Sequence, residues 1–257
     1  MNNYIVRQGS SKTVILLTAT VTPNVSSRLS VINPDLRLSQ YQQALLSWQD
    51  ALDPRLFELA VVETSGASES DLLAALSAKD RSRVRVLRHL PTASQIERGK
   101  GAIELAAVFS AIDSMPDLVA GSTLYKSTGR LNLLNSARIL SPLRPATVRV
   151  RMTADRSWAD TRIFGADLAT WKMVFGGVDF QVDDRSNRYL EKVVASRVSS
   201  AAALGDLQLS RFPRRPVFSG VSGSTGARYS SQSAIARGLI FDPIEGALAR
   251  IASKKQV

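Results

Sequence analysis

The chain has 257 residues, and its 33 Lys and Arg outnumber its 22 Asp and Glu, so that the formal net charge is +11. Hydrophobic residues make up 44% of the sequence, which is enough for a globular core. There is no cysteine and only one histidine, which excludes disulfide scaffolds, thiolate metal sites and cysteine nucleophiles and gives little basis for a zinc site. The length fits one large α/β domain or two small domains.

The positive charge favours anionic partners, such as phosphorylated substrates, nucleic acid or anionic lipid surfaces. It is spread along the chain, and aromatic residues are only 6%, so that a nucleic-acid partner is not expected. The apolar stretch at residues 14–17 is too short for the core of a signal peptide, and no apolar run is long enough to span a bilayer. These features predict a cytoplasmic protein.

Hydrophobic periodicity alternates between strands and helices over the first 130 residues. The predicted strands are residues 12–23, 56–66, 83–90 and 122–130. The predicted helices are residues 33–49, 68–79 and 99–115. The alternation predicts an α/β fold with a Rossmann-like, mostly parallel sheet, flanked by helices that form right-handed crossovers.

After Arg138 the pattern is less regular. A strand is predicted within residues 142–152, mixed strand and helix signals follow at residues 158–175, and an amphipathic helix is predicted at residues 186–204. A loop rich in Pro and Gly at residues 211–231 precedes a basic segment with helical pattern at residues 242–257. No repeat or linker interrupts the chain, so that one domain is predicted for residues 1–257.

Polar side chains gather where the predicted strands end, and ligands of parallel sheets bind at the carboxyl ends of the strands. The clusters are Thr18–Thr20, Glu63–Gly66 and Lys126–Arg130. A further cluster surrounds Lys100 at the start of a predicted helix. These positions predict the edge of the sheet that carries the functional site.

The sequence "YKSTGRLN" is the most specific of these clusters. Lys126 and Arg130, with Thr128 between them, suit a phosphate or diphosphate, because arginine offers a planar fork of donors and lysine a point charge. Gly129 permits close approach of a backbone. Lys100 at a helix start also suits an anion. The alternatives are a pair of solvated cations and an ordinary helix entry.

Four acids are candidates for acid–base chemistry: Glu63, Glu104, Asp160 and Glu191. Asp160 lies between apolar residues, where burial would tune its pKa. Glu191 lies on the amphipathic helix, where a solvated helix charge is an equally good interpretation. Glu104 lies one turn into the Lys100 helix and could be a capping acid.

The segment at residues 219–231 is rich in glycine and hydroxyl groups, and such a loop can wrap a phosphate or a sugar with backbone and hydroxyl donors. It fits a surface loop equally well. No pair of aspartates of the DxD type follows a predicted strand. No cofactor is therefore expected, and a divalent metal ion is possible but not indicated.

Eight short motifs occur in a characteristic order: "TATVTP", "DLRLSQYQQALLSW", "VVETSG", "RGKGAIE", "YKSTGRLNLLN", "DTRIF", "YLEKV" and "GVSGSTGARY". This order, from about Val14 to Tyr229, resembles a group of bacterial glycosyltransferases that are encoded with capsule and lipopolysaccharide O-antigen genes. The resemblance implies a GT-A-like fold, a nucleotide-sugar donor and a growing, lipid-linked glycan as acceptor. It implies that residues 12–138 form the nucleotide-binding half and residues 139–257 the acceptor-side half.

The resemblance also implies roles for individual residues. On the nucleotide side would lie Thr18, Thr20, Arg37, Glu63, Ser65 and Gly66. Toward the diphosphate or the sugar would lie Lys100, Lys126, Thr128, Gly129, Arg130, Ser222, Gly223, Ser224 and Thr225. Asp160 and Glu191 would lie nearer the acceptor, where one of them would deprotonate the attacking hydroxyl if the reaction inverts. The missing DxD departs from the usual GT-A pattern and puts dependence on Mg²⁺ or Mn²⁺ in doubt, because basic residues can balance the leaving diphosphate without a metal ion.

A different class of function remains open on the same residues. The net charge and the C-terminal "ALARIASKKQV" would also fit a non-enzymatic basic α/β module that binds nucleic acid or an anionic membrane surface. In the transferase interpretation, the same tail would make a weak peripheral contact with the inner face of the cytoplasmic membrane.

Overall fold

The computed structural model describes residues 13–24, 29–118 and 121–221, together with residues 226, 228, 229, 243 and 247. The strands are β1 Thr13–Ala19, β2 Phe57–Glu63, β3 Val84–Arg88, β4 Thr123–Thr128, β5 Asn132–Leu133, β6 Thr147–Arg149, β7 Ile163–Asp167, β8 Gln208–Ser210, β9 Phe218–Val221 and β10 Arg228–Tyr229. The α-helices are α1 Pro34–Ala51, α2 Glu69–Leu72, α3 Ala78–Arg81, α4 Ala93–Arg98, α5 Lys100–Asp113, α6 Ser136–Ile139, α7 Leu168–Phe175 and α8 Leu190–Leu204. Two 3-10 helices are η1 Val178–Gln181 and η2 Asp184–Ser186.

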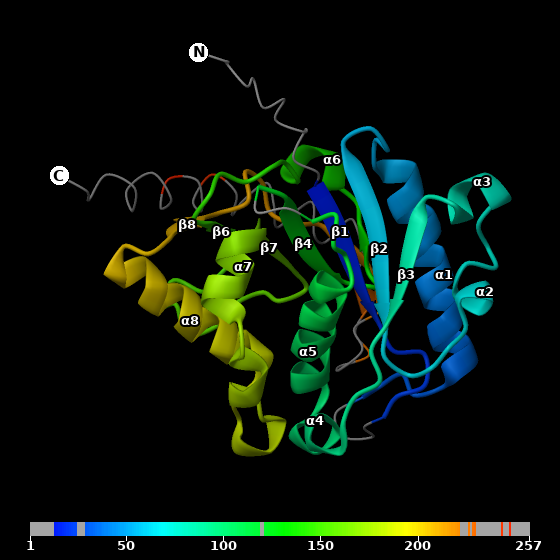
Figure 1. The fold of residues 1–257 in the computed structure, drawn as a ribbon, viewed down its shortest axis with the longest axis horizontal. Helices are drawn as coiled ribbons and strands as arrows, with labels where there is room; N and C mark the ends of the chain where they lie inside the picture. Colours follow the sequence, from blue (N-terminus) through cyan, green and yellow to red (C-terminus); the bar gives the residue numbers. More distant parts are fainter. Residues whose placement is uncertain are drawn as a thin grey trace, which may run out of the picture.

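Seven strands form one sheet in the order β3-β2-β1-β4-β7-β6-β8 (Figure 1). The first four strands of the chain are parallel, and β6 and β8 run in the same direction, while β7 runs against its neighbours. A second, three-stranded sheet has the order β10-β9-β5. The predicted class is confirmed: the protein is α/β, with a Rossmann-like, mostly parallel sheet flanked by helices.

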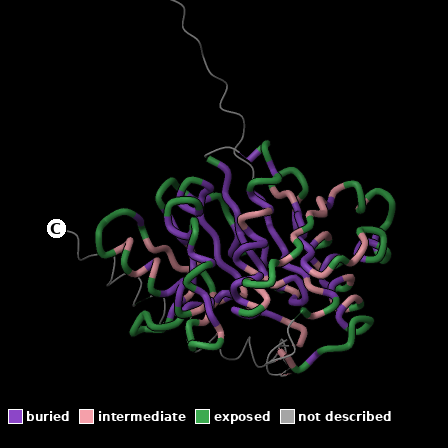
Figure 2. The backbone as a smooth tube through the Cα atoms, turned by 60° about the horizontal axis from the view of Figure 1, so that its bottom comes forward, coloured by how far each residue is buried: buried purple, intermediate pink, exposed green. Residues whose placement is uncertain are grey.

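Helices cover both faces of the large sheet (Figure 1), and every residue of β1 is buried. The buried part of the backbone lies in the interior of the molecule, with exposed segments around it (Figure 2). Alternate β1 side chains point to opposite faces, as in any strand. Val14 and Leu16 pack in the cluster that includes α5, α7 and α8. Ile15 and Leu17 pack in the cluster that includes α1. This alternation decides which polar side chains meet at the end of the sheet.

The helix after β1 begins where the sequence predicts. The Asn33 side chain accepts a hydrogen bond from the Leu36 N–H at 2.8 Å, and Pro34 occupies the first helical turn, where its missing N–H costs nothing. Tyr41, Leu45 and Trp48, which helical spacing places on one face, are buried against the sheet.

Two predicted segments differ from the structure. The single helix predicted at residues 68–79 is two short helices, since Ser68 caps α2 and Ser77 caps α3, and each capping hydroxyl starts a new turn. The loop predicted at residues 211–231 contains β9 and β10, which the sequence hides because both are short. Asn135 fixes this segment, donating to the Arg215 carbonyl and accepting from the Val217 N–H.

Of the basic segment predicted as a helix at residues 242–257, the structure describes residues 243 and 247, both helical. Within the described part of the chain, no helix combines the length and the apolar composition needed to cross a bilayer.

Candidate active site at the carboxyl edge of the sheet

The strand order reverses between β1 and β4, and in open α/β sheets ligands bind at this point, outside the carboxyl ends of the strands. The Gly129 N–H donates to the Thr18 carbonyl at 3.0 Å and ties the two strand ends together. Because β7 is antiparallel to β4, its first residues lie at the same edge, and the Thr128 N–H donates to the Arg162 carbonyl at 2.9 Å. The edge therefore combines residues from both halves of the chain.

Gly129 is required by this contact between strands. A Cβ atom at position 129 would stand 2.6 Å from the Thr18 carbonyl oxygen and 3.2 Å from the Tyr41 ring. The predicted close approach is therefore present, but the approaching backbone belongs to the protein's own β1.

Lys126 lies inside the wall of the site. Its side chain is only 1% exposed, and its ammonium donates to the Thr161 carbonyl at 2.7 Å and forms an ion pair with the Glu104 carboxylate. The Thr18 hydroxyl donates to the same carboxylate at 3.0 Å. Thr18 and Lys126 meet Glu104 because both point to the α5 face of the sheet. Because the ammonium binds Glu104 and the Thr161 carbonyl inside the protein, it can influence a ligand only through Glu104.

Glu191 is the acid of this cluster that is suited to exchange a proton. It lies in the first turn of α8, half-buried, and accepts a hydrogen bond from the Thr161 hydroxyl at 3.2 Å. Burial raises the pKa of the Glu191 carboxyl, and the nearby Glu104 carboxylate raises it further, against the opposing effects of Lys100 and Thr161. A partly exposed carboxyl with a raised pKa has the properties of a general acid or base.

Asp160, the other acid predicted near the acceptor, is tied to an arginine. Arg162 donates to its two oxygens from Nε at 2.8 Å and from Nη2 at 2.6 Å. The same guanidinium lies over the rings of Phe218 at 4.6 Å and Tyr229 at 5.1 Å. The pair braces the small sheet against the edge of the large one, which leaves Glu191 as the better candidate base.

Arg37 is buried on the opposite, α1 face of the same edge. It donates to the Thr20 carbonyl at 2.7 Å and to the Val31 carbonyl at 3.0 Å. The Tyr41 hydroxyl accepts from the Thr20 N–H at 2.8 Å and lies 3.4 Å from Arg37 Nη2. These bonds make Arg37 a clamp for the segment that follows β1.

Arg130 lies beside this clamp and has spare donors. It is 7% exposed, and among the described residues its one hydrogen bond runs from Nη1 to Gln40 Oε1 at 2.9 Å. Burial lowers the pKa of the Arg37 guanidinium, and the charge of Arg130 contributes to the lowering. No carboxylate of the described residues lies within ion-pair distance of either guanidinium. A buried cation in this setting favours an anionic ligand.

The Glu63 carboxylate binds backbone N–H groups of the neighbouring loops. Its buried carboxylate accepts hydrogen bonds from the N–H groups of Val21, Ser65, Gly66 and Ala67 at 2.7 to 3.1 Å. The Ser65 hydroxyl donates to it and accepts from the Thr22 N–H. The predicted nucleotide-side acid therefore joins the loops after β1 and β2, and its oxygens are already engaged.

Two threonine hydroxyls lie on that joint. Thr20 Oγ1 and Thr64 Oγ1 are 2.6 Å apart, and the Thr64 hydroxyl also donates to the Ala19 carbonyl. Thr20 is half-buried, so that part of its side chain faces solvent at the edge.

The carboxylate of Asp184 lies close to the start of α5 at Gly99 and Lys100. Gly99 has φ +105°, and a Cβ there would stand 2.5 Å from Asp184 Oδ2. The carboxylate of Asp184 in η2 therefore occupies the surroundings of this helix start, where the sequence predicts an anion. The positive charge of Lys100 opposes the rise in the pKa of Glu191 that burial causes.

The structure thus divides the predicted residues between three neighbouring groups. Thr18, Lys100, Lys126 and Glu191 surround Glu104. Thr20 and Arg37 contact Tyr41, and Arg130 lies beside Arg37. Glu63, Ser65 and Gly66 join the loops. The predicted Ser222, Gly223, Ser224 and Thr225 lie outside the described residues.

The sequence did not point to Thr161 or Tyr41, and it left Glu104 open between an acid–base role and a capping role. The available signal for Glu104 was its place one turn after "RGKG". In the described ranges no three His, Asp or Glu side chains are grouped so that they could hold a metal ion.

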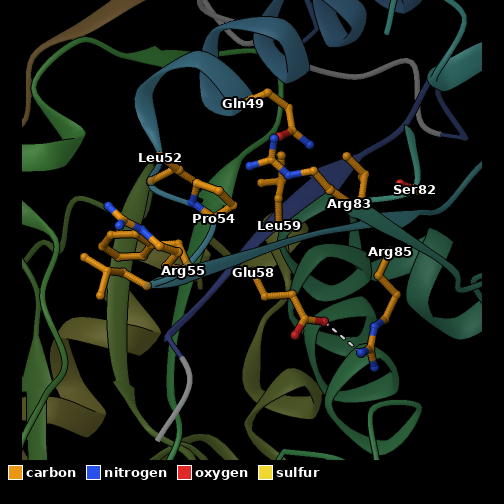
Figure 3. A pocket seen from close by; sticks show the side chains of 12 residues that line it. Gln49, Leu52, Pro54, Arg55, Glu58, Leu59, Ser82, Arg83 and Arg85 are labelled. Carbon is orange, nitrogen blue, oxygen red and sulfur yellow. Dashed lines mark ion pairs between the residues drawn. The ribbon is translucent and has the colours of Figure 1, made fainter. Parts of the chain in front are cut away.

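A cavity of about 510 Å³ lies elsewhere, at the end of the sheet where β2 and β3 begin (Figure 3). Its arginines are paired: Arg83 with Asp80 at 3.5 Å, and Arg85 with Glu58 at 2.8 Å. Ligands of parallel sheets bind at the opposite edge, and the cavity offers no uncompensated charge. We therefore place the candidate site at the carboxyl edge.

No protein-family model matches the chain, and no curated protein matches it. The solved structures that it resembles include a putative nucleotide-diphospho-sugar transferase from Desulfovibrio desulfuricans G20, at 13% identity and TM-score 0.44, covering 79% of this chain and 80% of the other. Mouse xyloside xylosyltransferase 1 matches at 10% identity and TM-score 0.42, with 79% and 84% covered.

The galactosyltransferase LgtC, in complex with donor and acceptor sugar analogues, matches at 8% identity and TM-score 0.45, with 77% of this chain and 73% of the other covered. At these identities and TM-scores the likenesses add nothing to the sheet order and side-chain contacts described above. The function is therefore inferred from the site itself.

Proposed function

We propose that the protein is a glycosyltransferase, which moves a sugar from a nucleotide-sugar donor to a glycan acceptor. The observation that carries the proposal is the carboxyl pair at the point of strand reversal. Glu191, with its raised pKa, lies beside Glu104, which is held by Lys126 and Thr18. In a transfer that inverts the anomeric centre, a general base at this position deprotonates the acceptor hydroxyl.

Glu191 is the base in this proposal. Its carboxylate removes the proton from the acceptor hydroxyl as the hydroxyl oxygen forms its bond to the anomeric carbon and the bond to the nucleoside diphosphate breaks. Lys126 acts indirectly, because its ammonium holds Glu104 in place. Glu104 in turn raises the pKa of Glu191. Lys126 is therefore a positioning residue.

The donor's diphosphate is assigned to Arg130, on the other side of the β1–β4 junction. Its support is the burial of a guanidinium with one neutral partner in the described part of the chain. Arginine binds phosphate oxygens in a fork, and this charge can balance the leaving diphosphate without a metal ion. Arg37 shapes the loop beside it, and Thr20 offers a partly exposed hydroxyl.

We further assign the acceptor to a growing, lipid-linked glycan of a bacterial surface, such as capsule or O-antigen, and the enzyme to the inner face of the cytoplasmic membrane. The support is the order of sequence motifs and the net charge of +11, which favours weak contact with anionic lipid. This assignment is separate from the chemistry, and either can stand without the other.

A thermal-shift screen against nucleotides and nucleotide sugars, with and without EDTA, tests the proposal. A ligand that binds the native state at about 100 times its Kd stabilises it by about 2.7 kcal/mol. For a chain of this size that corresponds to a rise in Tm of roughly 5–10 °C. We expect one nucleotide series to give this shift irrespective of EDTA. Binding that is lost with EDTA would refute the metal-free mechanism, and no shift with any nucleotide would refute the function.

A further inference from the structure

Two aromatic side chains stand at the surface next to Glu191. Trp158 and Tyr189 have ring centroids 6.1 Å apart and planes inclined by 58°. Trp158 is 39% exposed, whereas Trp48 and Trp171, the other two tryptophans of the chain, are 1% and 0% exposed. Aromatic side chains with a polar tip are enriched at binding interfaces, and adjacent exposed rings form an apolar patch that can bind a ligand.

Hydrogen bonds fix this pair relative to the candidate base. The Ala159 N–H donates to the Glu191 carbonyl at 3.1 Å, and the Thr161 hydroxyl donates to the Glu191 carboxylate at 3.2 Å. The segment at residues 158–161 therefore runs beside the start of α8. Trp158 directly precedes Ala159, and Tyr189 lies two residues before Glu191, so that the two rings meet beside this hydrogen-bonded contact.

The position of Tyr189 is set on several sides. It is the N-cap residue of α8, and its hydroxyl donates to Asn187 Oδ1 at 2.6 Å. Lys192 lies one turn along the helix with its ammonium 5.3 Å from the ring centroid. The ring is thus held by Asn187 and Lys192, and Trp158 keeps the larger exposed surface of the two.

We propose that Trp158 and Tyr189 form the acceptor subsite and bind a pyranose ring of the acceptor by its apolar face. The inference rests on the proposed function and specifies its acceptor. The negative faces of aromatic rings attract the C–H groups that line one face of a pyranose, as in β-galactosides and β-glucosides. A ring bound there would direct the hydroxyls on its edge to Glu191.

The uneven exposure of the three tryptophans gives a direct assay. Acrylamide quenches the fluorescence of accessible tryptophans, and in this protein that signal comes from Trp158. Methyl β-D-galactopyranoside and methyl β-D-glucopyranoside are the probes. We expect at least one of them to protect Trp158 from quenching, saturably and in the millimolar range typical of weak ligands. Sorbitol, an open-chain polyol without a ring face, should give no protection.

Matched variants locate the binding. Tyr189→Ala should weaken the protection at least tenfold, while Leu204→Ala, at the exposed far end of α8 about 20 Å away, should leave it unchanged. Saturation-transfer NMR with the same galactoside should lose its signal in Trp158→Ala and keep it in Trp158→Phe, which retains an aromatic ring.

Absence of protection by both pyranosides, equal protection by sorbitol, or protection that survives Tyr189→Ala would overturn the proposal. Nucleotide-sugar affinity, measured in parallel by calorimetry, separates it from the proposed function. Nucleotide binding without pyranoside protection refutes the subsite alone. Pyranoside protection without nucleotide binding supports pyranose binding at Trp158 and Tyr189 but refutes the transferase, and with it the acceptor role of the pair.

Discussion

Replacing Lys126 by methionine tests the buried ion pair that supports the site. The substitution keeps most of the side-chain volume but removes the ammonium, which leaves the Glu104 carboxylate without its cation and the Thr161 carbonyl without its donor. Breaking a buried pair by removing one partner costs about 3–5 kcal/mol. Because the Glu104 side chain is 24% exposed and water can reach it, we expect the lower end of this range, about 3 kcal/mol.

Urea unfolding followed by far-UV circular dichroism measures this loss as a shift of the midpoint at constant slope. The double variant Lys126→Met with Glu104→Gln removes the uncompensated charge and should recover roughly 1–2 kcal/mol of the loss. Lys172→Met removes an exposed lysine of α7 and should stay within about 0.5 kcal/mol of the wild type. A loss below about 1 kcal/mol for Lys126→Met, or no recovery in the double variant, would refute the reasoning.

Three further predictions concern the same edge. Glu191→Gln should lower transfer at least 100-fold, as expected for loss of a general base, with nucleotide affinity unchanged. Because burial raises the pKa of Glu191, the stability that its protonated carboxyl contributes is present at acid pH and is lost as pH rises through that pKa. The Tm of Glu191→Gln should therefore exceed that of the wild type at neutral pH and equal it at acid pH. A difference in Tm that does not change with pH would contradict this. Gly129→Ala places a Cβ 2.6 Å from the Thr18 carbonyl oxygen and should cost about 1–3 kcal/mol in urea unfolding, and a neutral result would show that the strand ends can separate. Arg130→Ala should weaken the binding of a nucleoside diphosphate, measured by calorimetry, by roughly tenfold or more. Arg130→Lys should weaken it less, because lysine keeps the charge but lacks the planar pair of donors. Unchanged affinity in both variants would show that Arg130 does not bind the donor.

Local patterns in the sequence were sufficient for most of the fold. The continuous apolar run of β1 predicts a buried strand. The extent of α1 and its apolar face follow from helical spacing, whereas residue type leaves its cap open between Asn33 and Asp35. The strand–helix alternation places the ligand edge where the polar clusters lie. These inferences succeed because each depends on neighbours in the chain.

The details of the site depend on contacts between distant segments, and there the sequence is insufficient. The position of Lys126 near the end of a predicted strand indicates its place at the edge. Whether its ammonium faces solvent depends on Glu104 of α5 and Thr161 before β7. Asp160 looks like an isolated buried acid until Arg162 folds back on it. Glu63 looks like a nucleotide ligand until the loop N–H groups enclose it.

The most direct test of the central claim is release of nucleoside diphosphate from a panel of nucleotide sugars, compared between the wild type and Glu191→Gln in the presence of EDTA. The account predicts that the wild type releases the nucleotide from at least one donor and that the variant, still binding that donor, does so at least 100-fold more slowly. Equal rates in the two proteins, or no release by the wild type from any donor that it binds, would contradict the account.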